Sequence, residues 1–224
     1  MGRIAEWVTA IKDYQNWDTN PKASRTQVTA ESTESHLEAA TKRVFSDAWI
    51  RQLGTQDHPD FFLASQRIGE LLEAEQSRQR KDSLTLDFMV AWERDQVDLP
   101  GFRFVRLEAK SAKGNLYTVN DTFPNPYPDR DEIYVLFSAK VRQVVVSTSA
   151  TMAASWVTSP SIASRYEESK ATTRQFGLDL RRIWEGTPVR TAARPTYRVP
   201  RKYAEVPATE DVLKALFAQA DLRD

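Results

Sequence analysis

The sequence contains no cysteine and only two histidines, His36 and His58. The lack of thiols excludes disulfide bonds, thiolate zinc sites and cysteine nucleophiles. Two histidines are too few for a histidine-rich zinc site, and neither lies in a motif typical of the base of a serine hydrolase. Any catalysis must therefore rely on carboxylates, lysines and hydroxyls.

Long hydrophobic runs are also missing. No apolar stretch approaches the length of a membrane span, and the first residues, MGRIAEWVTAIKDYQNW, are amphipathic and unlike a signal peptide. We therefore expect a cytoplasmic protein that does not contact a membrane. Neither sign of charge is in excess, with 31 basic and 31 acidic residues, which argues against indiscriminate binding of nucleic acid.

The chain has 224 residues, 41% of them hydrophobic, so it can form one domain with a sizeable core over residues 1–224. Apolar residues at helical spacing predict an N-terminal helical layer over residues 1–80. Its helices are expected at 3–16, 33–54 and 60–78, with Asp60 as a possible N-cap of the third. Residues 159–224 are expected to form a helix ending at Gly186, a basic extended segment and a closing helix over about 208–221.

Between these helical parts the hydrophobic pattern changes to a period of two. Residues 83–92 alternate apolar and polar side chains, and residues 102–110 form a second expected strand after a short turn, so the two predict a β-hairpin. The apolar runs 133–139 and 142–149 are typical of central strands. The order of elements predicts an α+β fold in which a central mixed sheet, over residues 83–150, is flanked by helices.

Three residues of the expected hairpin have side chains suited to phosphodiester chemistry. Asp87 lies inside the first strand, and Glu108 and Lys110 lie on one face of the second. Paired strands are about 5 Å apart, so the two carboxylates would repel each other unless a cation lay between them. Oxygen ligands with open positions suit Mg²⁺, and an ammonium group beside it can orient water and offset developing charge. The alternative is a surface ion pair between adjacent strands.

The segments LTLDF and RLEAK resemble the signature of the PD-(D/E)xK nuclease superfamily, which includes most type II restriction endonucleases. The resemblance implies a restriction-endonuclease-like core, Mg²⁺ held by Asp87 and Glu108, and Lys110 as the catalytic lysine. Leu86 stands where the family often has a proline, and Asp82 is an alternative first acid. Because a helix carboxylate joins the metal site in several branches, Glu70 is a further candidate ligand, although it also fits a solvated helix face.

Two segments could contact DNA. The loop after Lys110 offers amide, hydroxyl and charged groups for base edges, and the stretch 181–203 is rich in arginine and suits phosphates. The candidate DNA-binding residues are Lys113, Asn115, Asn120, Asp121, Thr122, Arg190, Arg194, Arg198 and Lys202. The alternatives are an ordinary turn-rich connection and a solvated basic face.

The sequence thus leads us to expect a Mg²⁺-dependent, sequence-specific endonuclease that cuts double-stranded DNA. Cutting both strands of a palindrome calls for two sites, so a two-fold homodimer is expected, with Trp7, Trp17 and Trp49 as candidates for its interface. Two alternatives remain open. One is a repair or structure-specific nuclease of the same fold, and the other is a non-catalytic module that binds DNA or a protein partner.

Overall fold

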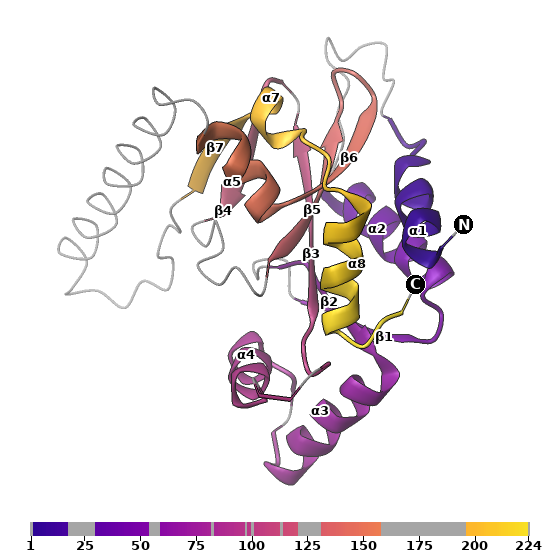
Figure 1. Ribbon diagram of the computed structural model, residues 1–224, viewed down its shortest axis with the longest axis vertical. Coiled ribbons are helices and arrows are strands. Elements are labelled where there is room, and N and C mark those ends of the chain that lie inside the picture. Colours follow the sequence, from indigo (N-terminus) through magenta and orange to yellow (C-terminus); the bar gives the residue numbers. More distant parts are fainter. Residues whose placement is uncertain are drawn as a thin grey trace, which may run out of the picture.

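A five-stranded mixed β-sheet forms the centre of the molecule, with helices on both sides (Figure 1). The computed structural model describes residues 2–17, 30–53, 59–81, 83–96, 98–99, 101–112, 114–120, 131–157 and 196–223. Its strands are β1 (Ala48–Gln52), β2 (Phe61–Ser65), β3 (Val105–Ala112), β4 (Leu116–Asn120), β5 (Glu132–Ser138), β6 (Gln143–Thr148) and β7 (Thr196–Pro200). Its helices are α1 (Arg3–Lys12), α2 (Ala30–Val44), α3 (Gln66–Arg78), α4 (Leu86–Asp95), α5 (Ser149–Val157), α7 (Arg201–Ala204) and α8 (Glu210–Gln219).

The strand order of the main sheet is β1-β2-β3-β5-β6. The first three strands are antiparallel neighbours, β3 and β5 are parallel, and β5 and β6 form an antiparallel hairpin. Strands β4 and β7 pair with each other in a second, two-stranded sheet. The expected α+β fold with a mixed central sheet is confirmed at this level of description.

One face of the main sheet is apolar and covered by α1, α2 and α8, and we call it the helix face. Leu107 of β3 and Val135 of β5 point to this side and join the main hydrophobic core with residues of the three helices. Phe137 packs edge-on against Tyr14, which follows α1, with ring centroids 5.0 Å apart. Burial of these side chains is the main driving force that holds the helices on the sheet.

The opposite face carries Arg106, Glu108 and Lys110 of β3, and we call it the site face. Near the start of β3 it is covered by α4, because Arg106 forms a buried ion pair with Glu93 of that helix. Near the end of β3 it is covered by a second apolar cluster, which includes Ala112 with residues of β4, β7, α5 and α7. Glu108 and Lys110 lie between these two packed regions.

The N-terminal part contains strands where the sequence predicts only helix. Residues 48–52 form β1 inside the expected helix 33–54, and residues 61–65 form β2 at the start of the expected helix 60–78. Helix α3 begins only at Gln66, and its N-cap is Ser65, whose hydroxyl accepts a hydrogen bond from the Ile68 amide. Asp60 is therefore not a helix cap. Pairing of β2 with two neighbours outweighs a local pattern that fits a helix.

The predicted strand over residues 83–92 is also wrong, because residues 86–95 form helix α4. Thr85 caps this helix by accepting a hydrogen bond from the Phe88 amide. The buried side chains Met89, Trp92 and Glu93 follow the spacing of a helix and face the sheet. The run satisfies both periods, and a short apolar run cannot distinguish them by periodicity alone. There is consequently no hairpin between residues 83–92 and β3.

The predictions after β3 are confirmed in part, since the end of the expected extended segment forms β7 and then the short helix α7. Strands β5 and β6 correspond to the two expected central strands, and α8 corresponds to the closing helix over about 208–221. The expected helix that ends at Gly186 lies outside the described residues. Of the helices in the described ranges, none combines the length and the apolar character that crossing a bilayer would need.

The tryptophans expected at a dimer interface belong mainly to the core of the chain itself. Trp7 is fully buried against Phe217, and its indole donates a hydrogen bond to Thr41. Trp49 is buried against Gly69 of α3, and Trp17 packs on Tyr14. Trp7 and Trp49 are therefore wrong as interface residues, since their side chains are already used inside one chain.

Candidate functional site

Asp60 and Glu108 meet where the β2–β3 ladder ends. The Asp60 amide donates a hydrogen bond of 2.9 Å to Glu108 Oε2, and the Ala109 amide donates one of 2.7 Å to Asp60 Oδ2. The last registered pair of the ladder is Phe61 with Leu107, so one further step places Asp60 opposite Glu108. Two acids from neighbouring strands are thus fixed beside each other on the site face.

Pro59 explains why the ladder ends here. A proline has no amide hydrogen and cannot continue the hydrogen bonding of a strand pair. In an extended register Pro59 would face Ala109 and could not donate to its carbonyl; the Ala109 amide donates to the Asp60 carboxylate and not to the Pro59 carbonyl. The sequence Pro59-Asp60 therefore replaces a backbone hydrogen bond by a side-chain one and turns the carboxylate towards β3.

Lys110 completes the group from the same strand as Glu108. Residues 108 and 110 are two apart in β3, so their side chains share a face, as the sequence predicts. Lys110 Nζ forms an ion pair with Glu108 Oε1. The Glu108 side chain is 1% exposed and that of Lys110 is 21% exposed. The ammonium group therefore lies at the solvent edge of a site whose second acid is buried.

The two acids disfavour each other's charge. Burial and the neighbouring charge of Glu108 raise the pKa of Asp60 to about 7. The charge of Glu34 in α2 raises this pKa as well, whereas the Ala109 amide and Lys110 lower it. In the protein without a cation, the Asp60 carboxyl group therefore holds a proton near neutral pH that an exposed aspartate would have lost.

Strand β5 adds further polar groups beside Glu108. Tyr134 is the registered neighbour of Glu108, is fully buried, and donates a hydrogen bond of 3.2 Å to Glu132 Oε2. Burial and the charges of Glu132 and Glu108 raise the pKa of Tyr134, so this phenol stays protonated. The preceding residue, Asp131, accepts hydrogen bonds from the Ala150 and Glu132 amides and ties the start of α5 to β5.

The donor set of Asp60 and Glu108 fits a hard divalent cation. Two carboxylates in a poorly solvated position are relieved of their repulsion by a positive ion. Within the described ranges, no three histidine, aspartate or glutamate side chains are grouped so as to hold a metal ion by themselves. An ion here would depend on water or phosphate oxygens for its remaining ligands, which is the usual situation of Mg²⁺.

The structure does not support the expected pairing of Asp87 with Glu108 across two strands. Asp87 belongs to the first turn of α4 and not to a strand, so the strand geometry that brought it near Glu108 is wrong. The position next to Glu108 in the neighbouring strand is taken by Asp60. Asp82, the alternative first acid, lies outside the described residues.

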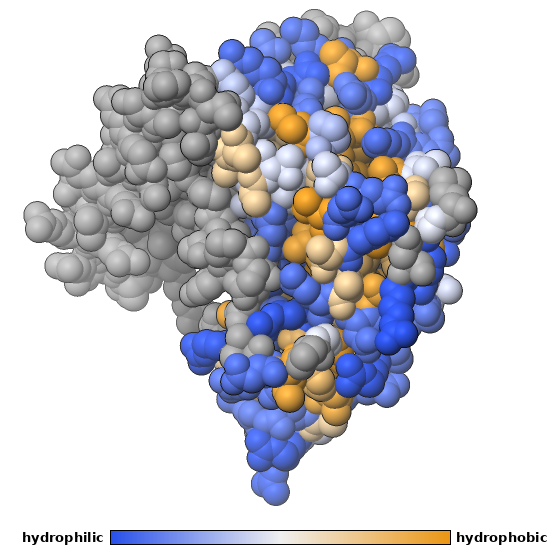
Figure 2. All heavy atoms as spheres, in the orientation of Figure 1, coloured by the Kyte–Doolittle hydropathy of each residue, from blue (hydrophilic) through white to orange (hydrophobic). Residues whose placement is uncertain are grey.

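Glu70 is not brought to the site either. Asp60 precedes β2 and α3 follows it, so the length of the strand, about 17 Å, separates Asp60 from the start of α3. Glu70 is exposed on α3, where it accepts a hydrogen bond from the Gln66 side chain. The helix then leads away from the sheet to a hydrophilic tip (Figures 1 and 2). Glu70 therefore belongs to the solvated face that the sequence offered as the alternative.

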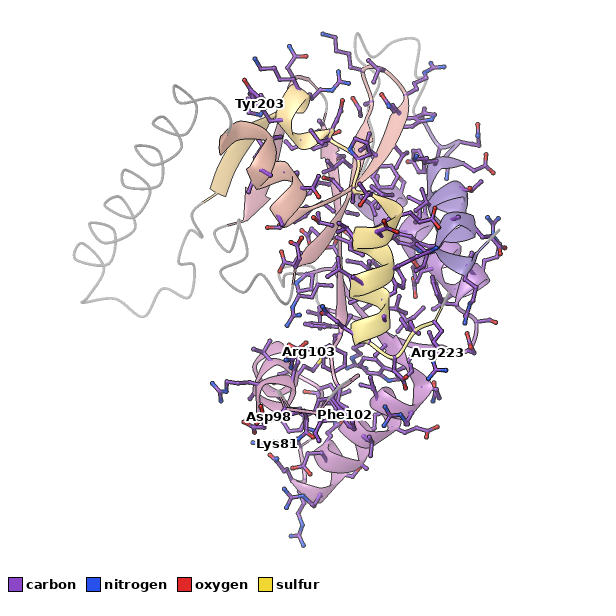
Figure 3. All side chains as sticks on the ribbon, viewed as in Figure 1. Lys81, Asp98, Phe102, Arg103, Tyr203 and Arg223 are labelled. Atoms are coloured by element: carbon purple, nitrogen blue, oxygen red, sulfur yellow. The ribbon has the colours of Figure 1, made fainter. Side chains whose placement is uncertain are left out.

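The candidate DNA-binding residues are only partly described. Lys113, Asp121, Thr122, Arg190 and Arg194 lie outside the described residues. Asn120 and Arg198 belong to the paired strands β4 and β7. Asn115 is exposed in the turn before β4 and accepts a hydrogen bond from Lys140. Lys202 is exposed on α7, and its ammonium lies 4.7 Å from the centre of the ring of Tyr203 in the same helix. Figure 3 labels Tyr203 at the upper end of the molecule.

Asp60 is the site residue that the sequence interpretation missed. The signal for it was the dipeptide Pro59-Asp60 directly before the apolar run FFLA, which is β2. A proline at the first residue or edge of a strand is a common arrangement, whereas the expected helix gave Asp60 only the role of a cap. Glu34, which is half-buried in α2, was missed too, and nothing in the sequence around it distinguishes it from the other acids of that helix.

Comparison with known proteins adds no family to these observations. No protein-family model matches the chain, and no curated protein and no solved structure matches it either. The interpretation of the site therefore rests on its residues and their geometry.

Proposed function

We propose that this chain is a Mg²⁺-dependent DNA endonuclease of the PD-(D/E)xK superfamily, in which Asp60 is the first acid. The segments Pro59-Asp60 and Glu108-Ala109-Lys110 carry every element of that signature, including the proline that is missing before Asp87. The observation that carries the proposal is the direct linkage of Asp60 to Glu108 and Ala109, with Lys110 paired to Glu108.

In this proposal Asp60 and Glu108 hold the cation. Mg²⁺ bound to such a pair supplies positive charge that polarises a phosphodiester and makes water more acidic. Because the pKa of Asp60 is raised, its carboxyl group must lose a proton when a cation binds, so cation binding depends on pH. The hydrogen bonds from the Asp60 and Ala109 amides fix the carboxylates in place before substrate arrives.

Lys110 acts on the substrate side of the pair. Its ammonium group is at the edge of the site and is oriented by the buried Glu108. From there it can donate a hydrogen bond to the attacking water or to a phosphate oxygen and offset the negative charge that develops in the transition state. The packed regions on either side, α4 and the β4–β7 sheet with α5 and α7, would flank the bound backbone.

The proposed substrate is double-stranded DNA, cut at a specific sequence in the manner of a type II restriction enzyme. A two-fold pair of chains would provide one such site for each strand. A repair or structure-specific nuclease would use the same three residues on a different DNA structure. The products distinguish the two, because a sequence-specific enzyme gives discrete fragments from plasmid DNA and an unspecific one gives a smear.

The test is cleavage of plasmid DNA in Mg²⁺ by the wild-type chain and by single variants. Asp60→Asn, Glu108→Gln and Lys110→Gln should each lower the rate at least about 100-fold, as is usual for loss of a charged group aimed at a transition state. Glu210→Gln, an exposed acid of α8 paired with Lys214, is the control and should cut at the wild-type rate.

Asp87→Asn decides between the two assignments of the first acid. We expect it to cut DNA, because Asp60 is hydrogen-bonded to the Glu108-Ala109 segment and Asp87 belongs to helix α4. Loss of cleavage in Asp87→Asn together with full activity in Asp60→Asn would overturn the site described above. No Mg²⁺-dependent cleavage by the wild-type chain on plasmid, nicked and branched DNA would leave the non-catalytic binding module as the better description.

A further inference from the structure

Arg51 of the edge strand β1 lies on the same face of the sheet as the candidate site. It is registered opposite Phe62 of β2, and Phe62 is registered opposite Arg106 of β3. Directly opposed residues of antiparallel strands project to the same side, so Arg51 belongs to the site face. The Leu53 amide donates a hydrogen bond of 2.9 Å to the Asp60 carbonyl, which keeps the end of β1 beside Asp60.

The guanidinium group of Arg51 has an unused donor. Its Nε atom is buried and makes no hydrogen bond with any residue that the structure describes, although the side chain as a whole is half-buried. A buried donor without an acceptor costs free energy, so such a group in a folded protein calls for an explanation. Arg106 and Lys110, the basic side chains of β3 on this face, are both engaged, with Glu93 and Glu108 respectively.

Arg51 is also not the counter-ion that Asp60 requires. The basic group that lowers the pKa of Asp60 is Lys110. Arg51 and Lys110 belong to β1 and β3, which lie on opposite sides of β2. Arg51 is in register with Arg106, four residues before Lys110, so the two side chains start about 10 Å apart across the sheet and about 13 Å apart along it, which is too far for one phosphate group to bind both. The two cations therefore flank the acidic pair and are suited to different groups of one extended anionic ligand.

We propose that Arg51 binds a backbone phosphate next to the one that is cut, and this inference rests on the proposed nuclease function. The planar guanidinium can donate two parallel hydrogen bonds to a phosphate, which gives it both charge and geometric fit. The unused donor of Arg51 is explained if its acceptor arrives with the substrate. Arg51 is thus a binding residue that aligns the DNA strand across β1, β2 and β3.

The experiment compares Arg51→Gln, Arg51→Lys and the control Arg43→Gln, which removes an exposed arginine at the end of α2. Binding of a fluorescent duplex oligonucleotide is measured in EDTA at several salt concentrations. Loss of one phosphate contact lowers the slope of log affinity against log salt by about 0.9 and the affinity about tenfold at 0.1 M salt. We expect Arg51→Gln to show both changes. Arg51→Lys keeps the charge and should lose less affinity, and Arg43→Gln should keep the wild-type slope.

Cleavage kinetics in Mg²⁺ provide the second readout. Arg51→Gln should raise KM about tenfold with little change of kcat, since a neighbouring phosphate is held equally in the ground state and the transition state. Mg²⁺ should raise the melting temperature of Arg51→Gln as it does that of the wild type, which shows that the variant is folded with an intact acidic pair.

The inference and the proposed function fail in different ways. If the wild type cuts DNA and Arg51→Gln has the same salt slope and the same KM as the wild type, the role of Arg51 is overturned. The proposed nuclease site is not affected by that result. A fall of kcat with KM unchanged would also overturn it, because that result places Arg51 at the scissile phosphate. If the wild-type chain neither cuts DNA nor binds it in a salt-dependent manner, both fall together.

Discussion

Asp60 and Glu108 hold each other through the backbone as much as through their side chains. Glu108 accepts a hydrogen bond from the Asp60 amide, and the Asp60 carboxylate accepts one from the amide that follows Glu108. Each carboxylate is therefore held by the backbone of the opposite segment, so Glu108 cannot turn away without losing the Asp60 amide and Asp60 cannot turn away without losing the Ala109 amide. Two carboxyl groups are thereby kept together, and the repulsion between their charged forms, which raises the pKa of Asp60, has consequences that can be measured.

The first consequence is a pH-dependent stability of the protein without a cation. The folded state holds the pKa of Asp60 at about 7, well above its ordinary 3.8, so the native chain binds a proton that the unfolded chain has lost. The stabilisation from this proton is complete below about pH 4 and is lost as the pH rises through 7. We expect the free energy of unfolding, measured with urea in EDTA, to fall between pH 5 and pH 8.

The variant Asp60→Asn isolates this effect. An amide cannot titrate, so the fall of stability with pH should be reduced, and the variant should be more stable than the wild type at pH 8 in EDTA. Glu210→Gln, whose acid is exposed, should keep the wild-type profile. A wild-type profile in Asp60→Asn would show that Asp60 carries its charge at neutral pH in the folded protein.

The second consequence is stabilisation by Mg²⁺. A cation that binds the folded chain and not the unfolded one raises the free energy of unfolding by mass action, by about 2.7 kcal/mol at a concentration 100 times its Kd, and so raises the melting temperature. We expect Mg²⁺ to raise the melting temperature of the wild type, and to do so more at pH 8 than at pH 6, because binding displaces the proton of Asp60.

Variants separate this site from other acids. Glu108→Gln should abolish the Mg²⁺ effect, because it removes one of the two carboxylates at the end of the β2–β3 ladder. Glu70→Gln should retain it, because Glu70 is exposed on α3 beyond the far end of β2. If Glu70→Gln abolished the Mg²⁺ effect and Glu108→Gln retained it, the cation would be bound by Glu70, the helix carboxylate that the sequence suggested.

The strand carrying Glu108 and Lys110 could be predicted from the sequence, and its partner could not. The alternation in residues 102–110 determines which side chains share a face of the strand, whatever lies beside it. The prediction that Glu108 and Lys110 share a face is therefore confirmed. Which acid stands opposite depends on strand pairing. Residues 61–107, including α3 and α4, separate Asp60 from Glu108, and no local period records which distant segment pairs with β3.

The error at residues 83–92 has the same origin. Leu84, Leu86, Phe88 and Val90 alternate as in a strand, but Met89, Trp92 and Glu93 are spaced as in a helix and are the residues that are buried. Their burial depends on Phe104 and Arg106 of β3, a distant segment of the chain on which α4 packs. Thr85 as an N-cap was the one local sign of the helix.

The ion pair between Glu93 and Arg106 should be essential to stability. Both side chains are buried, and the Phe104 amide also donates a hydrogen bond to Glu93. Glu93→Gln would leave the Arg106 charge buried without its acid, which typically costs about 3–5 kcal/mol. Urea unfolding should show this loss, and Glu75→Gln, which breaks an exposed pair with Arg78, should change the midpoint little.

The double variant Glu93→Leu, Arg106→Met provides the check on that explanation. If the loss comes from an uncompensated charge, replacing both partners with apolar side chains of similar size should restore much of the stability. A double variant less stable than Glu93→Gln would mean that the pair itself, rather than the unpaired arginine, contributes the free energy.

Close contact between α3 and β1 should make Gly69 intolerant of any side chain. A Cβ atom at this position would lie 2.2 Å from Cγ of Trp49, whose ring is itself buried, so the indole would have to move. Overpacking of this kind costs about 1–3 kcal/mol, and we expect Gly69→Ala to lower the free energy of unfolding by that amount. Gly114→Ala is the matched control, because an added Cβ there meets no atom within 4 Å.

Because α3 packs at the end of β1 away from Asp60, Gly69→Ala should keep its Mg²⁺-dependent rise in melting temperature, and loss of that rise would show that the position of α3 is coupled to the acidic pair.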